Sequence, residues 1–477
     1  MKDIDLEQLK KICRTSQFGP QMGYAETVSS ESLLLKPYNL KECKGIIDYC
    51  RDSNIKICPK GGGYSYGDMI LLEGEVILDC SELTKIISFD KEEGLISVEP
   101  GVSFADVFRL TLLENWTLTS CPGGMDVTIG GAISNNVHGK DAWDNGNFGD
   151  QVVSLEMILS DGSTLFLEKN DKRFSAVIGG MGLLGLVTRI DIKLKKIPSA
   201  FVQVKTEVVR NIEESLKVLE ARKLDSDFSV AWIDAFSKGD ILGRGYVTSA
   251  CWIEGELKVS KKQLEDSLTK PKFIFGFLPS KPFWFVGRLF FKPYALKILN
   301  KIHYFLAKIS FSKKNNSLSP VLFTDFNFMH NKIPDIREVY RPYGFYEFEP
   351  LIPFCGEGKN IRHLLELCQE YGAESLLCAV KSHKEDDYLI SFEGKGYSIG
   401  IDIQVKGRTE KSIRDFVKAL TDYVTSIEGK IYLAKDENIS KRSFEQMYPR
   451  YIEFIALKEE LDPDGVFCSD MYKRLMS

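Results

Sequence analysis

Two glycine-rich blocks constrain the fold of this chain more than any other feature. The first, PKGGGYSYGD, spans residues 59–68 and follows a predicted strand at residues 55–58. The second, CPGGMDVTIGGAISNNVHGK, spans residues 121–140. Consecutive glycines leave the backbone unshielded and free to adopt either sign of φ, so their N–H groups can converge on an anion. The first block alone fits a plain tight turn equally well, but the pair predicts a large phosphorylated ligand.

The surrounding sequence predicts an α+β fold. Short strands interrupted by glycine alternate with helices between Leu33 and Ile197. The pattern changes near Pro198, and we predict three parts: 1–200, 201–428 and 429–477, the last largely helical. Hydrophobic residues make up 44% and charged residues 27%, which excludes wholesale disorder. The net charge of −5 excludes a general nucleic-acid-binding protein.

Cysteine and histidine spacing predicts neither disulfides nor a metal site. The eleven cysteines include no C-x-x-C pair, and the five histidines include no H-E-x-x-H pair. The N-terminal residues are charged and amphipathic, so we expect no signal peptide. The chain also has no uninterrupted apolar stretch of about 18 residues, so we expect no transmembrane helix and a cytoplasmic location.

A third glycine motif, at residues 180–185, fits G-x-G-x-x-G. A dinucleotide-binding Rossmann unit would require a helix directly after it and an acid about 20 residues further on. The residues that follow are LVTRIDIKLKK, which alternate like a strand. We therefore reject the Rossmann interpretation and predict no nicotinamide site here.

In this order, the blocks PKGGGYSYGD, V-x-P-G-V and P-G-G-x-x-x-V-T-I-G-G-A-I-x-x-x-x-H-G-K resemble the vanillyl-alcohol oxidase superfamily of flavoproteins. The resemblance runs through residues 30–197. It implies a two-subdomain FAD-binding domain joined to a mixed-sheet substrate (cap) domain. It also implies the FAD contacts, which are Lys60, Gly61, Gly62, Gly63, Tyr64, Ser65, Tyr66, Pro122, Gly123, Gly124, Val127, Gly130, Gly131, Ser134, Asn135, His138, Gly139, Lys140, Gly185, Val187 and Tyr432.

Many members of this superfamily attach FAD covalently to a histidine in the first block, or to a cysteine in the second. Here Tyr64 and Gly124 occupy those positions, and Cys121 is three residues out of register. We therefore expect noncovalent FAD. His138 is the one histidine inside a motif, and a role in shaping the loop and a chemical role are both open.

A narrower resemblance comes from N-x-H-G-K-D-x-W-x-x-G-N-F-G-D and from motifs in the C-terminal half. These include Y-x-A-K-D at residues 432–436 and DPDGVFCSDMYKRL at residues 462–475. They are similar to the flavin-subunit family of decaprenylphosphoryl-β-D-ribose 2′-epimerase. That similarity implies oxidation of a sugar hydroxyl to a ketone, followed by reduction by a separate NAD(P)H-dependent short-chain reductase.

The narrower resemblance also implies catalytic residues. Lys435 matches the substrate-site lysine of that family, Lys381 a second lysine and Tyr66 an active-site tyrosine. A lysine beside the hydroxyl can stabilise developing alkoxide charge, or act as a base if burial lowers its pKa. Both roles are open at this stage.

Two departures from the family fall in the predicted substrate pocket, which includes Ser398. The family's cysteine is Gly400 here, and its two glutamines are Glu347 and Glu349. We expect these changes to affect the substrate more than the reaction. Glutamates suit a phosphate-bearing substrate only if Lys381 or Lys435 pairs with them. Alternatively one glutamate points to solvent, since positions i and i+2 share a face only on a regular strand.

Residues 267–324 contain no Asp or Glu, and residues 270–314 hold ten Lys or Arg, nine Phe and Trp284. We predict an amphipathic helix over Tyr294–Phe311 that lies on an anionic membrane surface without crossing it. The alternative is a hydrophobic insertion buried in the cap domain, with lysines at its rim.

Three functions follow from these observations. The first is an FAD-dependent oxidase of a polyprenyl-phosphate-linked sugar, peripheral on the inner face of the cytoplasmic membrane and acting with a reductase. The second is a soluble aldonolactone or alditol oxidase, although those enzymes typically carry the loop histidine that Tyr64 replaces. The third is a flavin-binding protein without activity, against which the presence of Tyr66 and Lys435 argues.

Overall fold

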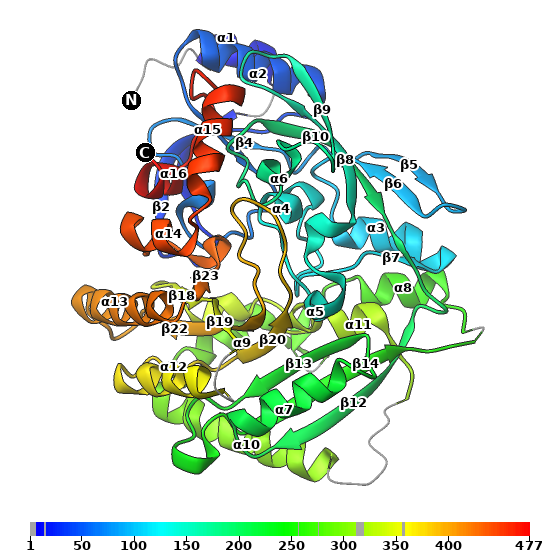
Figure 1. Ribbon diagram of the computed structural model, residues 1–477, viewed down its shortest axis with the longest axis vertical. Helices are drawn as coiled ribbons and strands as arrows, with labels where there is room; N and C mark the ends of the chain where they lie inside the picture. Colours follow the sequence, from blue (N-terminus) through cyan, green and yellow to red (C-terminus); the bar gives the residue numbers. More distant parts are fainter. Residues whose placement is uncertain (1–5, 14–15, 256, 275, 312–318, 355–357) are drawn as a thin grey trace.

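The computed structural model describes residues 6–13, 16–255, 257–274, 276–311, 319–354 and 358–477. Elements from the first 200 residues fill the upper part of Figure 1, and the central part of the chain fills the lower part. The C-terminal helices return to lie beside the first strands. Mixed sheets and helices of this kind agree with the predicted α+β class. Within the described residues, no helix is long and apolar enough to cross a membrane.

The first sheet has the order β1-β2-β4-β3, with β4 parallel to both of its neighbours. Helix α2 packs in the same hydrophobic cluster, and the side chain of Asn39 caps it by accepting the N–H of Glu42. The sequence predicts a helix over residues 39–53, which extends beyond α2 by one residue at each end. The elements are α1 (Leu6–Ile12), β1 (Ser16–Met22), β2 (Ser29–Leu35), α2 (Leu40–Asp52), β3 (Ile57–Lys60) and β4 (Val76–Asp79).

The second sheet is antiparallel, with the order β5-β6-β10-β8-β9. Residues 180–185 lead directly into strand β10, as predicted, so no Rossmann helix follows the third glycine motif. The elements are β5 (Ile86–Asp90), β6 (Leu95–Val98), α3 (Phe104–Thr111), β7 (Trp116–Thr117), α4 (Ile129–Ser134), α5 (Ala142–Asn145), β8 (Val152–Ile158), β9 (Thr164–Glu168), α6 (Phe174–Val177), β10 (Leu186–Lys193) and β11 (Lys195–Lys196).

An eight-stranded sheet with the order β17-β12-β14-β13-β20-β21-β19-β23 organises the rest of the chain. A separate pair, β18 and β22, lies beside it. The elements are β12 (Phe201–Val209), α7 (Ile212–Arg222), β13 (Phe228–Ile233), β14 (Gly245–Trp252), β17 (Val321–Leu322), β18 (Phe345–Phe348), β19 (Pro350–Pro353), α12 (Lys359–Glu370), β20 (Cys378–His383), β21 (Gly396–Ile399), β22 (Ile401–Gln404), α13 (Glu410–Ser426) and β23 (Lys430–Ile431).

The alternating sequence of residues 397–405 predicts one strand, and this prediction is wrong. Gly400 interrupts it, because its N–H donates to the carbonyl of Ala379 at 2.9 Å. Strand β21 before the glycine pairs with β20, whereas β22 after it pairs with β18. The break therefore sends one strand to each of two sheets.

The basic and aromatic segment forms short elements between β14 and β17. The predicted helix at residues 294–311 is confirmed as α10, which packs against β12 and β14. The elements are α8 (Lys261–Ser267), β15 (Phe273–Ile274), β16 (Leu278–Pro279), α9 (Ser280–Gly287), α10 (Pro293–Phe311), α11 (Phe323–Asn327) and the 3-10 helix η6 (Ile336–Val339).

The C-terminal residues pack on the first sheet. The N–H of Cys468 donates to the carbonyl of Ile57 at 2.8 Å, and Arg474 binds both carboxylate oxygens of Asp68 at 2.7 and 2.9 Å. We also predict from the sequence that residues 429–477 return to the N-terminal part, and these contacts agree with that. The return and the three domain boundaries stay predictions. The helices are α14 (Lys441–Met447), α15 (Tyr451–Leu461) and α16 (Asp470–Leu475).

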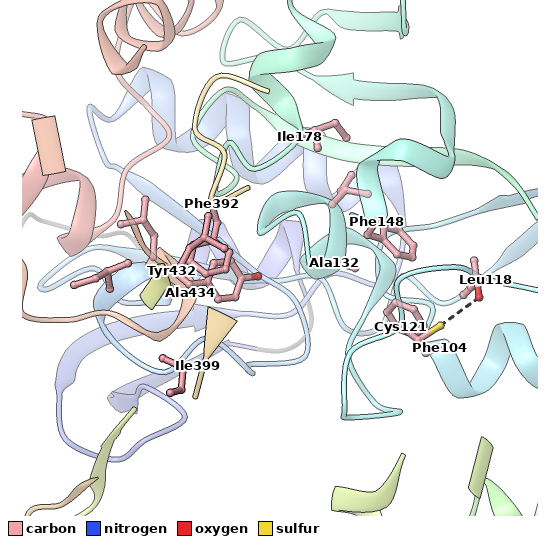
Figure 2. Close-up of a cluster of buried hydrophobic side chains, with 14 of the residues drawn as sticks. Phe104, Leu118, Cys121, Ala132, Phe148, Ile178, Phe392, Ile399, Tyr432 and Ala434 are labelled. Carbon is pink, nitrogen blue, oxygen red and sulfur yellow. Dashed lines mark hydrogen bonds between the residues drawn. The ribbon is translucent and has the colours of Figure 1, made fainter. Parts of the chain in front are cut away.

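One hydrophobic core joins the N-terminal part to the eight-stranded sheet. Phe104 and Phe148 from the second glycine-block region belong to the same buried cluster as Ile399 and Tyr432. Figure 2 shows Tyr432 and Phe392 gathered on one side of this cluster and Phe148 on the other. The candidate site lies where these parts meet.

Candidate functional site

The two glycine blocks lie against each other. A Cβ at Gly61 would fall 2.4 Å from Thr128 Oγ1, and one at Gly130 would fall 2.6 Å from the Cβ of Pro100. Gly62 donates its N–H to Thr128 Oγ1 at 3.3 Å, and Gly63 has a φ of +73°. Only glycine permits these approaches, so the structure brings together the predicted cofactor residues of both blocks.

Polar atoms of the second block fit a bound cofactor. Asn135 Oδ1 and His138 Nδ1 are buried and have no hydrogen-bond partner among the described residues. Tyr432 donates its hydroxyl to the carbonyl of Asn135 at 2.9 Å, which ties the C-terminal segment to this block. Buried polar atoms normally form hydrogen bonds. These two unpaired atoms therefore indicate that a polar group of a bound ligand contacts them.

Tyr64, at the histidine position, and Cys121, the cysteine of the second block, are both engaged elsewhere. Tyr64 donates its hydroxyl to Asp126 at 3.1 Å, and burial raises its pKa. Cys121 lies in the core, where its thiol contacts the carbonyl of Leu118 at 3.4 Å (Figure 2). These contacts support noncovalent binding, which stays a prediction.

Lys140 contacts the cap rather than the glycine blocks. Its buried ammonium donates to the carbonyls of Phe326 and Asn327, at 3.2 and 2.7 Å, and burial lowers its pKa to about 7. The lysine of the H-G-K motif thus links the second block to α11, and its predicted FAD contact stays a prediction. Gly185, at the start of β10, has no room for a side chain, because a Cβ there would meet Met157 at 2.4 Å.

A charged cluster brings together the predicted catalytic and pocket residues. Lys435 pairs with both Glu347 and Glu349, lying 2.8 Å from the Oε2 of Glu349. Lys381 Nζ lies 3.6 Å from the Oε1 of Glu349. The Lys435 ammonium lies 5.4 Å from the centroid of the Tyr66 ring. The first glycine block, β18 and β20 therefore converge on one centre.

The surroundings of the two lysines separate their roles. Burial opposes the charge of Lys435, but Glu347 and Glu349 outweigh it and raise the pKa above its usual value. Burial lowers the pKa of Lys381, and Lys435 lowers it further while Glu349 acts against both. Lys435 is therefore a fixed ammonium and suits charge stabilisation. Of the two, Lys381 is the better suited to accept a proton, and both catalytic roles stay predictions.

Both glutamates face the cluster. Glu349 is only 2% exposed, and burial would raise its pKa, yet Lys435, Lys381 and His138 hold it well below its usual value. The alternative that one glutamate points to solvent is therefore wrong. The condition for a phosphate-bearing substrate, pairing of the carboxylates with these lysines, is met. Gly400 lies close by, because a Cβ there would be 3.8 Å from Glu347 Oε1.

A buried series of hydrogen bonds runs from Glu349 through Ser398 and His383 to Glu393. Ser398 Oγ donates to Glu349 Oε1 at 3.1 Å, and His383 Nε2 lies 2.8 Å from Ser398 Oγ. His383 Nδ1 lies 2.8 Å from Glu393 Oε1. Because the Glu349 carboxylate can only accept, the serine hydrogen points to it and His383 Nε2–H donates to the serine oxygen; the contact between His383 Nδ1 and Glu393 then needs a second proton, on the ring or on the carboxyl group. His138 Nε2 lies 3.0 Å from Glu349 Oε1.

Sequence reasoning missed His383 and Glu393. A signal existed for His383, since it lies two residues after Lys381 on β20 and side chains two apart share a face. Glu393 lies between strands and gives no such signal. Burial lowers the pKa of His138 to about 3, so its ring is neutral and donates from Nε2. His138 thus contacts the charged cluster, and its role in shaping the loop stays a prediction.

His138, His383 and Glu393 also offer ligand atoms within 4.8 Å of one another, close enough to share a metal ion. Both ring nitrogens of His383 already lie at hydrogen-bond distance from protein oxygens. Hydrogen bonding therefore accounts for the position of His383. The absence of a metal stays a prediction.

The basic and aromatic segment presents its apolar side chains to solvent. Phe285 is 66%, Phe290 68% and Ile309 69% exposed. On α10 the buried stripe includes Leu296 and Tyr304. The alternative of a buried insertion is therefore contradicted. The exposed apolar set is Phe277, Phe285, Val286, Leu289, Phe290, Tyr294, Ile298, Leu299, Ile302, Phe305, Leu306 and Ile309.

Comparison with known sequence families identifies the class. The family described as FAD binding domain matches residues 32–168, and the family described as D-arabinono-1,4-lactone oxidase matches residues 336–475. These ranges contain both glycine blocks and the charged cluster. The two matches fit the vanillyl-alcohol oxidase type of FAD flavoproteins. The chain is an FAD-dependent oxidoreductase that acts on CH–OH groups.

Individual relatives narrow the comparison. Decaprenylphosphoryl-beta-D-ribose oxidase of Mycolicibacterium smegmatis is 27% identical over 435 residues, covering 88% of this chain and 89% of the relative. L-gulonolactone oxidase of Bos taurus is 23% identical over 455 residues, covering 91% and 93%. Cytochrome-type mitochondrial D-lactate dehydrogenase 1 of Saccharomyces cerevisiae is 26% identical over 179 residues, covering 35% and 30%.

Proposed function

We propose that this protein oxidises a hydroxyl group of a polyprenyl-phosphate-linked sugar to a ketone. The observation that carries the chemistry is the Lys435 ammonium, paired with two carboxylates and lying against Tyr66 of the first glycine block. FAD, when bound, supplies the acceptor for the hydride that leaves the sugar carbon. The glycine blocks, with Asn135 and Tyr432, would hold it.

The chain's own residues handle the charge and the proton. As the C–H bond breaks, negative charge develops on the substrate oxygen, and the fixed ammonium of Lys435 is placed to stabilise it. The hydroxyl proton passes to Lys381 Nζ, whose pKa burial lowers. Glu349 holds both lysines, at 2.8 and 3.6 Å, and Ser398 fixes the direction of that carboxylate.

The exposed face of α9 and α10 supports a lipid-linked substrate. Exposed apolar patches of this extent mark contact with a partner or a membrane. The segment carries basic residues and no acid, so its charge is complementary to anionic lipid. Phe and Leu side chains would enter the acyl boundary and lysines would lie among headgroups. We propose that the protein binds the inner face of the cytoplasmic membrane here.

A second enzyme completes the proposed reaction. The product is a keto sugar, and the glycines of residues 180–185 lead into β10 of the FAD-binding part rather than into a nicotinamide site. A separate NAD(P)H-dependent short-chain reductase would reduce the ketone to the opposite epimer. Given NADH, this protein alone is expected to form no epimer; formation of epimer would contradict the two-enzyme scheme.

An aldonolactone or alditol oxidase is the second candidate. The lactone oxidase match over residues 336–475 favours it, as does the L-gulonolactone oxidase relative. Anaerobic bleaching of the flavin distinguishes the two. We expect polyprenyl-phosphate sugars to bleach the flavin, and aldonolactones, free polyols and nucleotide sugars to leave it oxidised. Bleaching by polyols or lactones alone would select the second candidate.

A further inference from the structure

We propose that Arg337 forms a binding subsite for the phosphate group of the substrate, between the exposed face of α9 and the charged cluster. This inference rests on the proposed function, because it assigns the phosphate of a lipid-linked sugar to one side chain. No motif of the sequence pointed to Arg337.

Arg337 contacts the ring of Tyr24, which in turn packs against Tyr66 beside the charged cluster. Its guanidinium carbon is 4.0 Å from the centroid of the Tyr24 ring, and Nη1 donates to the carbonyl of Tyr24 at 3.0 Å. The Tyr24 ring is in turn 5.0 Å from that of Tyr66, which lies beside Lys435. The contact with the Tyr24 ring and the bond to its carbonyl hold the guanidinium in place, and no other hydrogen bond of its N–H groups to a described residue is seen.

The neighbouring cations are paired, but Arg337 is not. Arg288 pairs with Glu338, Arg341 with Glu26 and Glu338, and Lys332 with Asp325. Arg337 forms no ion pair with any carboxylate in the described ranges of the chain. A half-buried guanidinium without a carboxylate partner is suited to a planar, bidentate contact with a phosphate.

The position of Arg337 also fits the direction of a lipid-linked substrate. Helix α9 packs on η6, which carries Arg337, and Trp284 of α9 donates its Nε1–H to the carbonyl of Pro334 at 2.8 Å. Trp284 and Phe291 pack on the same small hydrophobic cluster as Tyr24 and Tyr66. A polyprenyl chain at the exposed face would therefore place its phosphate near Arg337 and its sugar near Lys435.

The test uses the FAD-loaded protein, with farnesyl phosphate and farnesol as probes. Binding is followed by the change in flavin absorbance, and FAD content is measured for every variant. We expect Arg337→Met to weaken farnesyl phosphate binding about 10- to 100-fold, as a lost charge-assisted contact implies, and to leave farnesol binding unchanged. Arg337→Lys should restore part of the loss. The control is Lys332→Met, which removes a nearby paired cation and should change neither affinity.

Three results would overturn the subsite. They are unchanged farnesyl phosphate binding in Arg337→Met, an equal loss for farnesol, and loss of FAD, which would place Arg337 at the cofactor. The substrate reaction is measured separately. Oxidation of a polyprenyl-phosphate sugar with an unchanged KM in Arg337→Met would sink the subsite alone. Arg337-dependent binding of farnesyl phosphate without oxidation of any such sugar would sink the proposed function alone.

Discussion

The glycine-block region and the α9–α10 region differ in how closely they are packed and in what they expose to solvent. Around Gly61 and Thr128 the backbone is packed so closely that no side chain fits. On α9 and α10, by contrast, large apolar side chains such as Phe285 and Ile309 stay in water. The first arrangement builds a rigid cradle for a cofactor. The second leaves apolar side chains that no described residue covers, so it points to a partner or a membrane.

The charged cluster lies between these two regions, and the largest expected effect is there. Lys435→Met should slow anaerobic flavin reduction by roughly a hundredfold or more, because a fixed charge on the substrate oxygen is lost. FAD should remain bound, since the glycine blocks hold it. Stopped-flow absorbance and FAD content measure the two. Lys418→Met, on the exposed side of α13, is the control, and reduction at the normal rate in Lys435→Met would refute the assignment.

The second effect concerns the proton acceptor. A lysine whose pKa is lowered loses its proton at lower pH, so flavin reduction should rise as the pH increases through the pKa of Lys381. Lys381→Met should lose this rise and react roughly 100-fold more slowly. The measurement is the pH profile of single-turnover reduction. A variant that keeps the wild-type profile would exclude Lys381 as the base.

Breaking the exposed face should affect membrane binding and leave the cradle intact. The double variant Phe285→Asp and Phe290→Asp should lower the fraction that floats with anionic vesicles about tenfold, because charge opposes entry into the acyl boundary. Phe166→Asp, on the exposed side of β9, is the matched control. Flotation of wild type should weaken with salt. Equal flotation of the double variant and the control would argue against the face.

Substitutions in the series of hydrogen bonds that ends at Glu349 should have a smaller effect on the rate of flavin reduction. His383→Gln should slow flavin reduction about tenfold, because Ser398 loses the donor that directs its hydroxyl to Glu349. Glu393→Gln should act in the same direction. The pH profile should shift with the rate, since Glu349 influences the pKa of Lys381. A slower rate with an unmoved pH profile would indicate that His383 has a structural role only.

The metal content of the purified protein is a separate test. One equivalent of bound metal would contradict the account of His383 as a hydrogen-bonded residue.

The smallest effect tests the attachment of the cofactor. Acid precipitation should release all of the yellow colour into the supernatant, and Cys121→Ser should change neither the FAD content nor its release. The reason is that the Cys121 thiol lies in the core beside Leu118. Colour that stays with the denatured pellet would show a covalent bond.

How much the sequence could predict follows the same division. The glycine blocks, Lys435, Tyr66 and the two glutamates were found because short motifs carry them. The length of α10 followed from its apolar and basic pattern. The break at Gly400 was missed because it depends on a hydrogen bond to Ala379 in another strand. His383 was missed although it shares the β20 face of Lys381. Glu393 and Arg337 were missed because only folding brings them beside His383 and Tyr24.

The central claim is that the charged cluster and the exposed face serve the same substrate molecule. Single-turnover flavin reduction tests it directly, with a polyprenyl-phosphate sugar presented either in anionic vesicles or as a water-soluble short-chain analogue. The account predicts that Phe285→Asp with Phe290→Asp slows reduction by the vesicle substrate and leaves reduction by the soluble analogue at the wild-type rate. Equal rates with the vesicle substrate in the variant and in wild type would contradict it.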